Sequence, residues 1–489
     1  MNPIVITATQ LRHLYGCHRR IWLDAQGDPR ERAPIDPQAA ARLDAGWAHE
    51  NIVQTATAGA VTLIPVTSWA DGVRVTREEM DRGAANFMGA HLEHTFALDG
   101  MARPIQLRGK ADRLRRATSF VGGQRRAGYI AVEIKSYGVL TDADRVQMDA
   151  YICLLQQTDK AIGSTGEFWL GRDARGQPNT RIQHTLDRER LRTAVLAAAQ
   201  VIVGDAPGVL LTKGCAACPW LSACRRQPRI AHDLTLLSGL RTDSQAALRA
   251  AGINTLDRVA AEAPDHLRRF RGIKTTAEAM HAHARAWLAE APIWFSQPPP
   301  ICAEQGYYFD IETRLDTGAT WCIGWQHDAA APEIAIVAPA RAPGSTTLAD
   351  GQLLHLVPDT AALWRRFARG VSADESPIAH WTAFDATAMR HEAPADVSDA
   401  LGARLHDLHA SVTRSVRLPT FGASIKEIAS TLGFAWSGYN SHVPAYADYL
   451  AWLHSGDDAA LMQACAYQRD DVLALQHIWR WMRAITPHP

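Results

Sequence analysis

The fold is most constrained by an apolar run at residues 129–136, in which Glu133 and Lys135 are the only charged side chains. An apolar run of this length predicts a buried strand. Side chains two residues apart on a strand share a face, so Glu133 and Lys135 point the same way while Ile134 points back into the core. A carboxylate binds a hard divalent cation, and a lysine beside it positions water and stabilises developing negative charge. The run therefore predicts a strand that carries a candidate metal site.

Three other segments supply side chains suited to the same site. Asp112 lies on an earlier segment that reads as a neighbouring strand, and His49 lies on an expected helix before it. Gln147 and Tyr151 are spaced i, i+4 on an expected helix and share one face over the site. A Glu-x-Lys pair alone is usually a solvated pair, and a lone histidine is usually a surface or core residue. The order and spacing of the whole series favour a site over these separate explanations.

This series of His, Asp, Glu-x-Lys and Gln-x3-Tyr resembles the RecB-like branch of the PD-(D/E)xK nuclease superfamily, which implies a restriction-endonuclease-like α/β core. The resemblance implies that Mg²⁺ or Mn²⁺ is held by three side chains and one backbone carbonyl, those of His49, Asp112, Glu133 and Ile134. It also makes Lys135 the catalytic lysine, with Gln147 and Tyr151 as supporting residues.

Four of the eight cysteines form a second motif. Cys215, Cys218 and Cys224 are spaced Cys-x2-Cys-x5-Cys. Three thiolates this close together suit a soft or borderline metal, and clustered cysteines in a cytoplasmic chain more often bind metal than form disulfides. Cys17, just before a basic helix start, is the expected fourth ligand. The isolated cysteines are expected in the core, and they are Cys153, Cys302, Cys322 and Cys465.

One cysteine before the nuclease core and three after it resembles the layout of the iron–sulfur RecB-like nucleases, which include the CRISPR-adaptation nucleases and the AddB type. The resemblance implies that a [4Fe–4S] cluster is bound by Cys17, Cys215, Cys218 and Cys224 and clasps the ends of the domain together. A structural zinc site is the alternative, although zinc sites more often use two Cys-x2-Cys pairs.

A second carboxylate motif lies in the C-terminal part of the chain. Residues 306–313 form another apolar run, in which Asp310 and Glu312 share one face of the expected strand. Asp385 follows a polar and aromatic segment at 378–384. On an expected C-terminal helix, a tyrosine and an aspartate follow at i, i+4 spacing, which also places them on one face.

That tyrosine and aspartate are Tyr467 and Asp471, and Asp470, about a quarter-turn away, is the alternative last acid. The complete series resembles the DEDD exonucleases of the RNase H-like fold. Residues 424–434 also resemble that family's Ser-Leu-Lys-x-Ile segment. Residues 380–383 depart from its Asn-rich lead-in, which puts in doubt which neighbours of the second motif touch substrate.

Four carboxylates around two cations about 4 Å apart fit two-metal hydrolysis of a phosphodiester, in which one metal lowers the pKa of the attacking water. The four acids are Asp310, Glu312, Asp385 and Asp471. Tyr467 is expected to orient the nucleophile. A degenerate domain that only binds nucleic-acid ends is the alternative.

The remaining segments predict the domain organisation. Residues 231–291 resemble helix-hairpin-helix modules, whose glycine turns expose backbone N–H groups to phosphate without base readout. A plain helical spacer is the alternative. A proline-rich linker is expected at 292–302. A PD-(D/E)xK nuclease domain is then expected at 1–230 and an RNase H-like α/β domain at 303–489.

Composition and charge argue against a membrane-spanning or secreted protein and favour a nucleic-acid partner. No apolar stretch is long enough for a membrane span and the N-terminus lacks the layout of a signal peptide, so we expect a cytoplasmic protein with no membrane partner. The net charge of zero conceals a basic half, because residues 1–230 contain 30 Lys and Arg against 23 Asp and Glu. A basic half suits phosphate backbones.

The sequence therefore predicts an iron–sulfur, metal-dependent nuclease that cleaves DNA exonucleolytically in repair, recombination or defence. Its expected partner is DNA with single-stranded or open ends. The sequence contains no Gly-x4-Gly-Lys-Ser/Thr motif, so any unwinding is expected from a separate helicase. Two alternatives remain, an RNA 3′–5′ exonuclease driven by the C-terminal site and a non-catalytic end-binding subunit of a helicase–nuclease complex.

Overall fold

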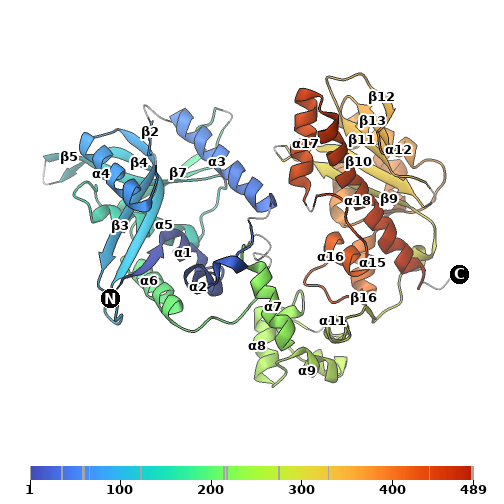
Figure 1. Cartoon of the computed structure of the whole chain (residues 1–489), viewed down its shortest axis with the longest axis horizontal. Coiled ribbons are helices and arrows are strands. Elements are labelled where there is room, and N and C mark those ends of the chain that lie inside the picture. The colour runs from blue at the N-terminus through green and yellow to red at the C-terminus, as the bar shows by residue number, and fades with distance from the viewer. Residues whose placement is uncertain are drawn as a thin grey trace. The chain divides into compact units, whose positions relative to one another are not determined.

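The computed structural model describes residues 2–34, 37–57, 61–64, 66–121, 124–173, 175–212, 215, 218–273, 276–315, 317–328, 330–439 and 441–485. The chain divides into two compact units, Met1–Cys224 and Arg225–Pro489. Each unit is a mixed α/β structure, which confirms the α/β part of the predicted fold class (Figure 1). The iron–sulfur clasp and the helix-hairpin-helix assignment stay predictions. None of the helices in the described part of the chain has the length and apolar character needed to span a bilayer.

The first unit is built on a seven-stranded mixed sheet with the order β2-β3-β4-β5-β6-β7, in which β1 also pairs with β4. The β3–β4, β4–β5 and β6–β7 pairs are antiparallel, and the β1–β4, β2–β3 and β5–β6 pairs are parallel. The strands are β1 (Ile4–Thr7), β2 (Val61–Leu63), β3 (Asn86–Phe96), β4 (Ile105–Val121), β5 (Gln124–Lys135), β6 (Thr165–Leu170) and β7 (Thr180–Thr185).

Helices complete the first unit and create two apolar cores. They are α1 (Ala8–His13), α2 (His18–Gln26), α3 (Pro37–Thr57), α4 (Trp69–Arg82), α5 (Asp142–Gln156), α6 (Arg188–Val203) and the start of α7 (Leu221–Ala231), with a short 3-10 helix at Pro29–Glu31. The larger core packs α1, α5 and α6 against the sheet. A smaller core joins Val53 of α3 to Val132, Ile134 and Trp169. Because side chains alternate along β5, Glu133 lies on the face opposite to Ile134.

The second unit contains another seven-stranded mixed sheet, with the order β12-β13-β11-β10-β9-β14-β15. The strands are β9 (Tyr307–Thr313), β10 (Thr320–His327), β11 (Glu333–Val337), β12 (Gly344–Thr347), β13 (Leu353–Val357), β14 (Ile378–His380) and β15 (Leu405–Asp407). The central strand β9 is antiparallel to β10 and parallel to β14. A separate two-stranded sheet pairs β8 (Ile293–Trp294) with β16 (Val416–Arg417), so part of the expected linker forms a strand.

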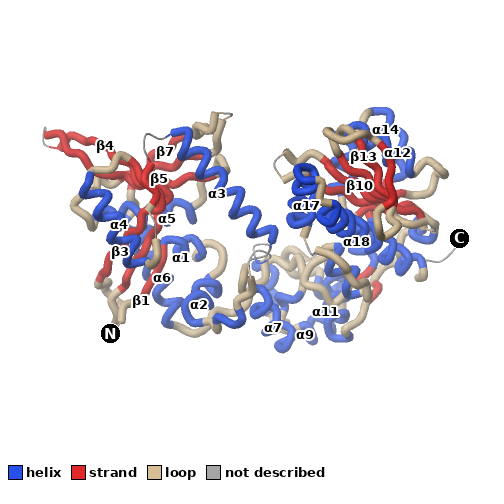
Figure 2. Tube along the Cα trace, turned by 45° about the horizontal axis from the view of Figure 1, so that its top comes forward, coloured by secondary structure: helices blue, strands red, loops and turns tan. Residues whose placement is uncertain are grey.

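Helices cover both faces of this second sheet. They are α12 (Thr360–Gly370), α13 (Ala383–Glu392), α14 (Ala395–Leu401), α15 (Leu408–Ser415), α16 (Ile425–Thr431), α17 (His442–Ser455) and α18 (Asp458–Arg483), with 3-10 helices η4 (Pro300–Ala303) and η5 (Gly402–Arg404). Phe309 and Ile311 of β9 pack toward α12, whereas Tyr308 packs toward α18. The alternation therefore turns Asp310 and Glu312 toward α18, which Figure 2 shows lying along the sheet.

The helical segment expected between the two domains lies within the second unit. It comprises η3 (Leu234–Leu236), α8 (Thr242–Ala250), α9 (Leu256–Ala261), α10 (Pro264–Leu267) and α11 (Ala277–Ala289), which share their own core. Gly239, Gly252 and Gly272 occupy its turns with φ of +81°, +80° and +78°, a left-handed conformation that favours glycine. Phosphate binding by these turns remains a prediction.

Candidate active sites

The antiparallel pairing of β4 with β5 brings the first acids together. Asp112 Oδ2 accepts a hydrogen bond of 2.8 Å from the Ile134 N–H, and Lys135 Nζ lies 2.6 Å from Glu133 Oε1. Burial, followed by the charges of Glu133 and Glu50, raises the pKa of Asp112 well above its usual value. Burial lowers the pKa of Lys135, but Glu133 and Asp112 outweigh burial and raise it overall, so the ammonium stays charged.

Two buried atoms of the expected metal ligands have no hydrogen-bond partner among the described residues, His49 Nε2 and Glu133 Oε2. Buried polar atoms are rarely left unpaired, so both suit a metal ligand role. Burial and then the charge of Arg172 lower the pKa of His49 and favour the neutral ring that metal binding requires. These orphaned atoms fit the Mg²⁺ or Mn²⁺ that the resemblance implies.

Glu50 is a further acid at this site, and the sequence reasoning missed it. Burial, and then the charge of Glu133, raises the pKa of Glu50 to about 7, while Lys135 and Lys110 oppose that rise. Glu50 directly follows His49, but successive residues on a helix diverge by about 100°. The position of Glu50 next to His49 in the sequence therefore does not predict that both side chains lie at one site.

Gln147 and Tyr151 meet on α5 beside the acids. Gln147 Nε2 donates a hydrogen bond of 2.7 Å to the Tyr151 hydroxyl. Burial, followed by the charges of Glu133 and Asp112, raises the pKa of Tyr151. The ring fits against β4 because Gly109 has no side chain there, and a Cβ at Gly109 would lie 2.8 Å from Tyr151 Cδ1.

Arg12 of α1 was also missed from the sequence, and its charge acts to lower the pKa of Lys135 and of Tyr151 at the first site. Arg12 Nη2 is 3.1 Å from Asp144 Oδ1, which accepts a hydrogen bond of 2.6 Å from the Tyr137 hydroxyl. Arg12 and His13 also line the pocket that contains the cysteines. Helix α1 therefore contributes residues near the first site and in the cysteine pocket.

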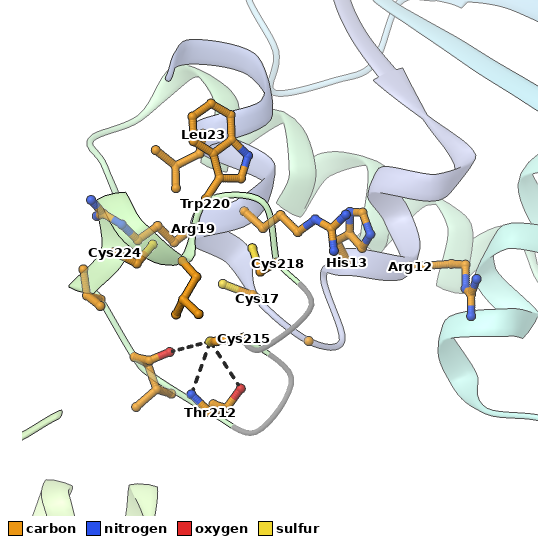
Figure 3. Close-up of a pocket in the computed structure, with 15 residues that line it drawn as sticks. Arg12, His13, Cys17, Arg19, Leu23, Thr212, Cys215, Cys218, Trp220 and Cys224 are labelled. Atoms are coloured by element: carbon orange, nitrogen blue, oxygen red, sulfur yellow. Dashed lines mark hydrogen bonds between the residues drawn. The ribbon is translucent and has the colours of Figure 1, made fainter. Parts of the chain in front are cut away.

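The four predicted cysteines line one pocket of about 180 Å³ (Figure 3), and they are Cys17, Cys215, Cys218 and Cys224. All four are free thiols and half-buried. Cys215 Sγ accepts a hydrogen bond of 3.3 Å from the Thr212 N–H. Burial raises the pKa of Cys218, and a backbone hydrogen bond from Trp220 opposes it. Free thiols that face one cavity have donor chemistry that fits a metal or an iron–sulfur cluster. No three of these sulfur atoms, all of which belong to described residues, lie within 4.8 Å of one another.

The second acid cluster is the tightest of the candidate sites. Asp310 and Glu312 of β9 and Asp471 of α18 each offer a carboxylate oxygen within 4.8 Å of the others. Among the described residues, this is the one group of three or more potential ligands that meets this distance, so His49, Asp112 and Glu133 do not meet it together. Burial, and then the charge of Asp471, raises the pKa of both Asp310 and Glu312.

Asp385 lies near this cluster but outside the 4.8 Å group. It is buried in the first turn of α13, and Asp385 Oδ2 is 3.8 Å from His380 Nδ1. Burial raises the pKa of Asp385 to about 7, and backbone hydrogen bonds oppose that rise. Its charge in turn raises the pKa of Asp310 and Glu312, so the four predicted acids interact electrostatically.

Three further side chains contact the second cluster. Lys426 Nζ lies 3.4 Å from Asp471 Oδ1. Burial raises the pKa of Asp471 to about 6, against the opposing effects of Lys426 and of a hydrogen bond with Tyr467. Gln468 Nε2 donates to the Asp310 carbonyl at 2.9 Å and to Asp310 Oδ2 at 3.0 Å. Sequence analysis assigned no role to Gln468, because this residue lies between the motif positions Tyr467 and Asp471.

Asp470 belongs to a different set of contacts. Asp470 Oδ2 accepts hydrogen bonds from the N–H groups of Ser437, at 2.7 Å, and Gly438, at 3.1 Å. The Ser437 hydroxyl also donates to it at 2.8 Å. Asp471, and not Asp470, therefore joins the acid cluster.

Comparison with known proteins finds one superfamily match in each unit. Residues 10–225 match the PD-(D/E)XK nuclease superfamily, and residues 307–483 match the RNase H superfamily. These matches confirm the two predicted superfamilies, whose members typically hydrolyse nucleic acids with divalent metals. A search of curated proteins found no match. A solved structure described as "Crystal structure of SSO0001" is 13% identical, with 46% of this chain and 87% of that chain covered and a TM-score of 0.26.

Proposed function

We propose that this protein is a DNA exonuclease with two separate metal-dependent active sites that act on single-stranded or open ends. The observation that carries the proposal is the cluster of Asp310, Glu312 and Asp471 within an RNase H superfamily domain. Bound divalent cations supply an activated water and stabilise charge on the attacking and leaving oxygens. Burial favours this use, because buried carboxylates without a cation repel one another.

The residues of each site have distinct roles in this proposal. At the second site Asp310, Glu312, Asp385 and Asp471 hold the cations, and the Tyr467 hydroxyl orients the nucleophile. At the first site His49, Asp112, Glu133 and the Ile134 carbonyl hold the cation. Lys135 is held by Glu133 and stays protonated, so it stabilises negative charge on the phosphate.

Glu133→Gln and Asp385→Asn test the two sites separately. End-labelled single- and double-stranded DNA and RNA are incubated with Mg²⁺ or Mn²⁺, and each substitution is expected to remove one product pattern with a rate loss of about 100-fold or more. Matched controls are Glu167→Gln, which alters a pair with Arg115, and Asp350→Asn, which alters a pair with Arg469. If neither Glu133→Gln nor Asp385→Asn changes cleavage, the protein does not use these sites. Preferential cleavage of RNA would support the RNA exonuclease alternative.

We also propose that Cys17, Cys215, Cys218 and Cys224 bind a [4Fe–4S] cluster that joins the two ends of the first unit. Trp220 Nε1 already donates a hydrogen bond of 2.8 Å to Asp24 Oδ1, which links the same two segments. Protein purified without oxygen is expected to absorb visible light and to contain iron and sulfide. Cys218→Ser should lose both, whereas Cys153→Ser, in the core, should retain them. A colourless protein that contains zinc alone would show that the site is a zinc site.

A further inference from the structure

Lys426 in the second unit is the lysine of the segment at 424–434, and it occupies an environment that the proposed metal ligands do not explain. Its Nζ lies 4.3 Å from the ring centroid of Trp436 and 4.4 Å from that of Tyr467. The same atom lies 3.4 Å from Asp471 Oδ1. Two aromatic faces and one carboxylate therefore hold an ammonium group beside the acid cluster. We call the two rings, Trp436 and Tyr467, the aromatic cage.

The aromatic cage is fixed by contacts of its own. Trp436 Nε1 donates a hydrogen bond of 2.9 Å to Ser430 Oγ, and the Trp436 ring packs edge-on against Phe434. The next two residues are held through their N–H groups by Asp470. Tyr467 projects from α18, the helix that carries Asp471. The cage is thus built from a fixed loop and a helix of the site.

We propose that Lys426 is a built-in cation of the second active site: it neutralises Asp471 before metal binds and moves to the substrate phosphate once metal occupies the acids. This inference rests on the proposed function of the second site. An ammonium is attracted to aromatic faces, and these faces bring no net charge that would compete with the phosphate. The cage can therefore keep the ammonium within reach of the site after Asp471 has turned to the metal. A lysine suits this movement because it is a compact charge on a flexible stem.

The proposed role makes opposite predictions for metal binding and for cleavage. Before metal binds, the ammonium competes with the cation for Asp471, so its removal should tighten metal binding. During cleavage the ammonium stabilises the phosphate, so its removal should slow the reaction at saturating metal. A lysine that served only to stabilise the fold would not move these two quantities in opposite directions.

The test uses the full chain in an Asp112→Asn, Glu133→Gln background, so that bound Mn²⁺ reports the second site. Mn²⁺ binding is measured by electron paramagnetic resonance at pH about 8.5, where proton competition is small. Lys426→Met is expected to lower the Kd for Mn²⁺ about three- to tenfold and to slow cleavage about tenfold or more at saturating Mn²⁺. Lys426→Gln should behave alike, and Lys426→Arg should regain part of the cleavage rate. Asp471→Asn should lose the bound Mn²⁺.

Arg341→Gln is the matched control, because the Arg341 guanidinium lies 4.2 Å from the Trp452 ring centroid and donates to the Trp452 carbonyl. It should change neither Mn²⁺ binding nor cleavage. Unchanged or weaker Mn²⁺ binding in both Lys426→Met and Lys426→Gln, or wild-type cleavage in both, would overturn the inference. If the background protein binds Mn²⁺ but does not cleave, the proposed function is wrong, and the Mn²⁺ comparison still decides whether Lys426 competes with metal.

Discussion

Asp470 and Asp471 are adjacent on α18, yet the helix turns them toward different neighbours. Asp471 points to Asp310 and Glu312, while Asp470 holds the loop at Ser437 and Gly438. A buried carboxylate that accepts several hydrogen bonds contributes to stability, whereas a buried carboxylate among other acids opposes it. Neighbouring residues of the same type should therefore respond oppositely to substitution.

Asp470→Ala should lower the free energy of unfolding of the second unit by about 1–3 kcal/mol, because the Ser437 and Gly438 N–H groups lose their acceptor. Asp471→Asn should leave this free energy unchanged or raise it, and should remove cleavage at the second site. Urea unfolding and the end-label assay measure the two effects. A stable Asp470→Ala variant without cleavage would instead place Asp470 in the reaction.

Gly324 of β10 allows α18 to pack closely against the sheet, because glycine has no side chain. A Cβ there would lie 2.8 Å from Gln468 Cγ and 2.9 Å from Val472 Cγ2. Gly324→Ala should therefore displace α18 and lower the free energy of unfolding of the second unit by about 1–3 kcal/mol. Gly402→Ala, where a Cβ meets nothing within 4 Å, is the control for the substitution itself. Equal unfolding midpoints for the two variants would mean that α18 can shift to accommodate the added methyl group without a loss of stability.

At the scale of elements, the sequence predicted the acids that share a strand or a helix, because spacing alone places them on one face. Asp310 with Glu312, and Tyr467 with Asp471, follow from i, i+2 and i, i+4 spacing. The sequence did not predict the contact of Lys426 with Asp471, because α16 and α18 are separate helices and only tertiary packing brings them together.

Helix α1 is the element of the first unit that contributes to both the cysteine pocket and the nuclease site. Its N-terminus is closed by a capping box, in which Thr7 Oγ1 accepts from the Gln10 N–H at 3.1 Å and Gln10 Oε1 accepts from the Thr7 N–H at 2.8 Å. A cap of this kind stabilises a helix by about 1 kcal/mol. The cap therefore helps to place Arg12 and the residues that lead to Cys17.

Thr7→Ala should increase amide hydrogen exchange across α1 by about fivefold, which corresponds to the loss of about 1 kcal/mol from the cap. It should also weaken first-site cleavage through Arg12 while second-site cleavage stays unchanged. Thr255→Ala removes the cap of α9 in the second unit and serves as the control, since it should leave exchange in α1 unaltered. Unchanged exchange in the Thr7→Ala variant would show that packing alone holds α1.

At the scale of the whole molecule, buried histidines and buried carboxyl groups have opposite effects on the stability of the folded protein as pH rises. His13 and His283 have pKa values lowered to about 4 by burial, so they favour the folded state as pH rises and their effect is complete above pH about 6.5. Glu50 and Asp385 have pKa values raised to about 7 by burial, so the folded state holds more protons than the unfolded state between pH about 4 and 7. The acids therefore destabilise the folded protein as pH rises through that window.

Between pH about 6.5 and 8 the histidine contribution is already constant, so the metal-free protein should lose stability in both units as Glu50 and Asp385 ionise. The loss over this range should reach about 0.8 kcal/mol for each group, since one pKa unit corresponds to about 1.4 kcal/mol and each group is already partly ionised at pH 6.5. Mg²⁺ or Mn²⁺ should restore the lost stability at pH 8, because a cation that binds only the folded state stabilises it. Urea unfolding with chelator and with metal measures the free energy of unfolding at each pH. Asp385→Asn should reduce the loss of stability between pH about 6.5 and 8 in the second unit alone. If the metal-free protein became more stable from pH about 6.5 to 8, ionisation of Glu50 and Asp385 would not destabilise the folded state. The second acid cluster would then need no cation to stay folded.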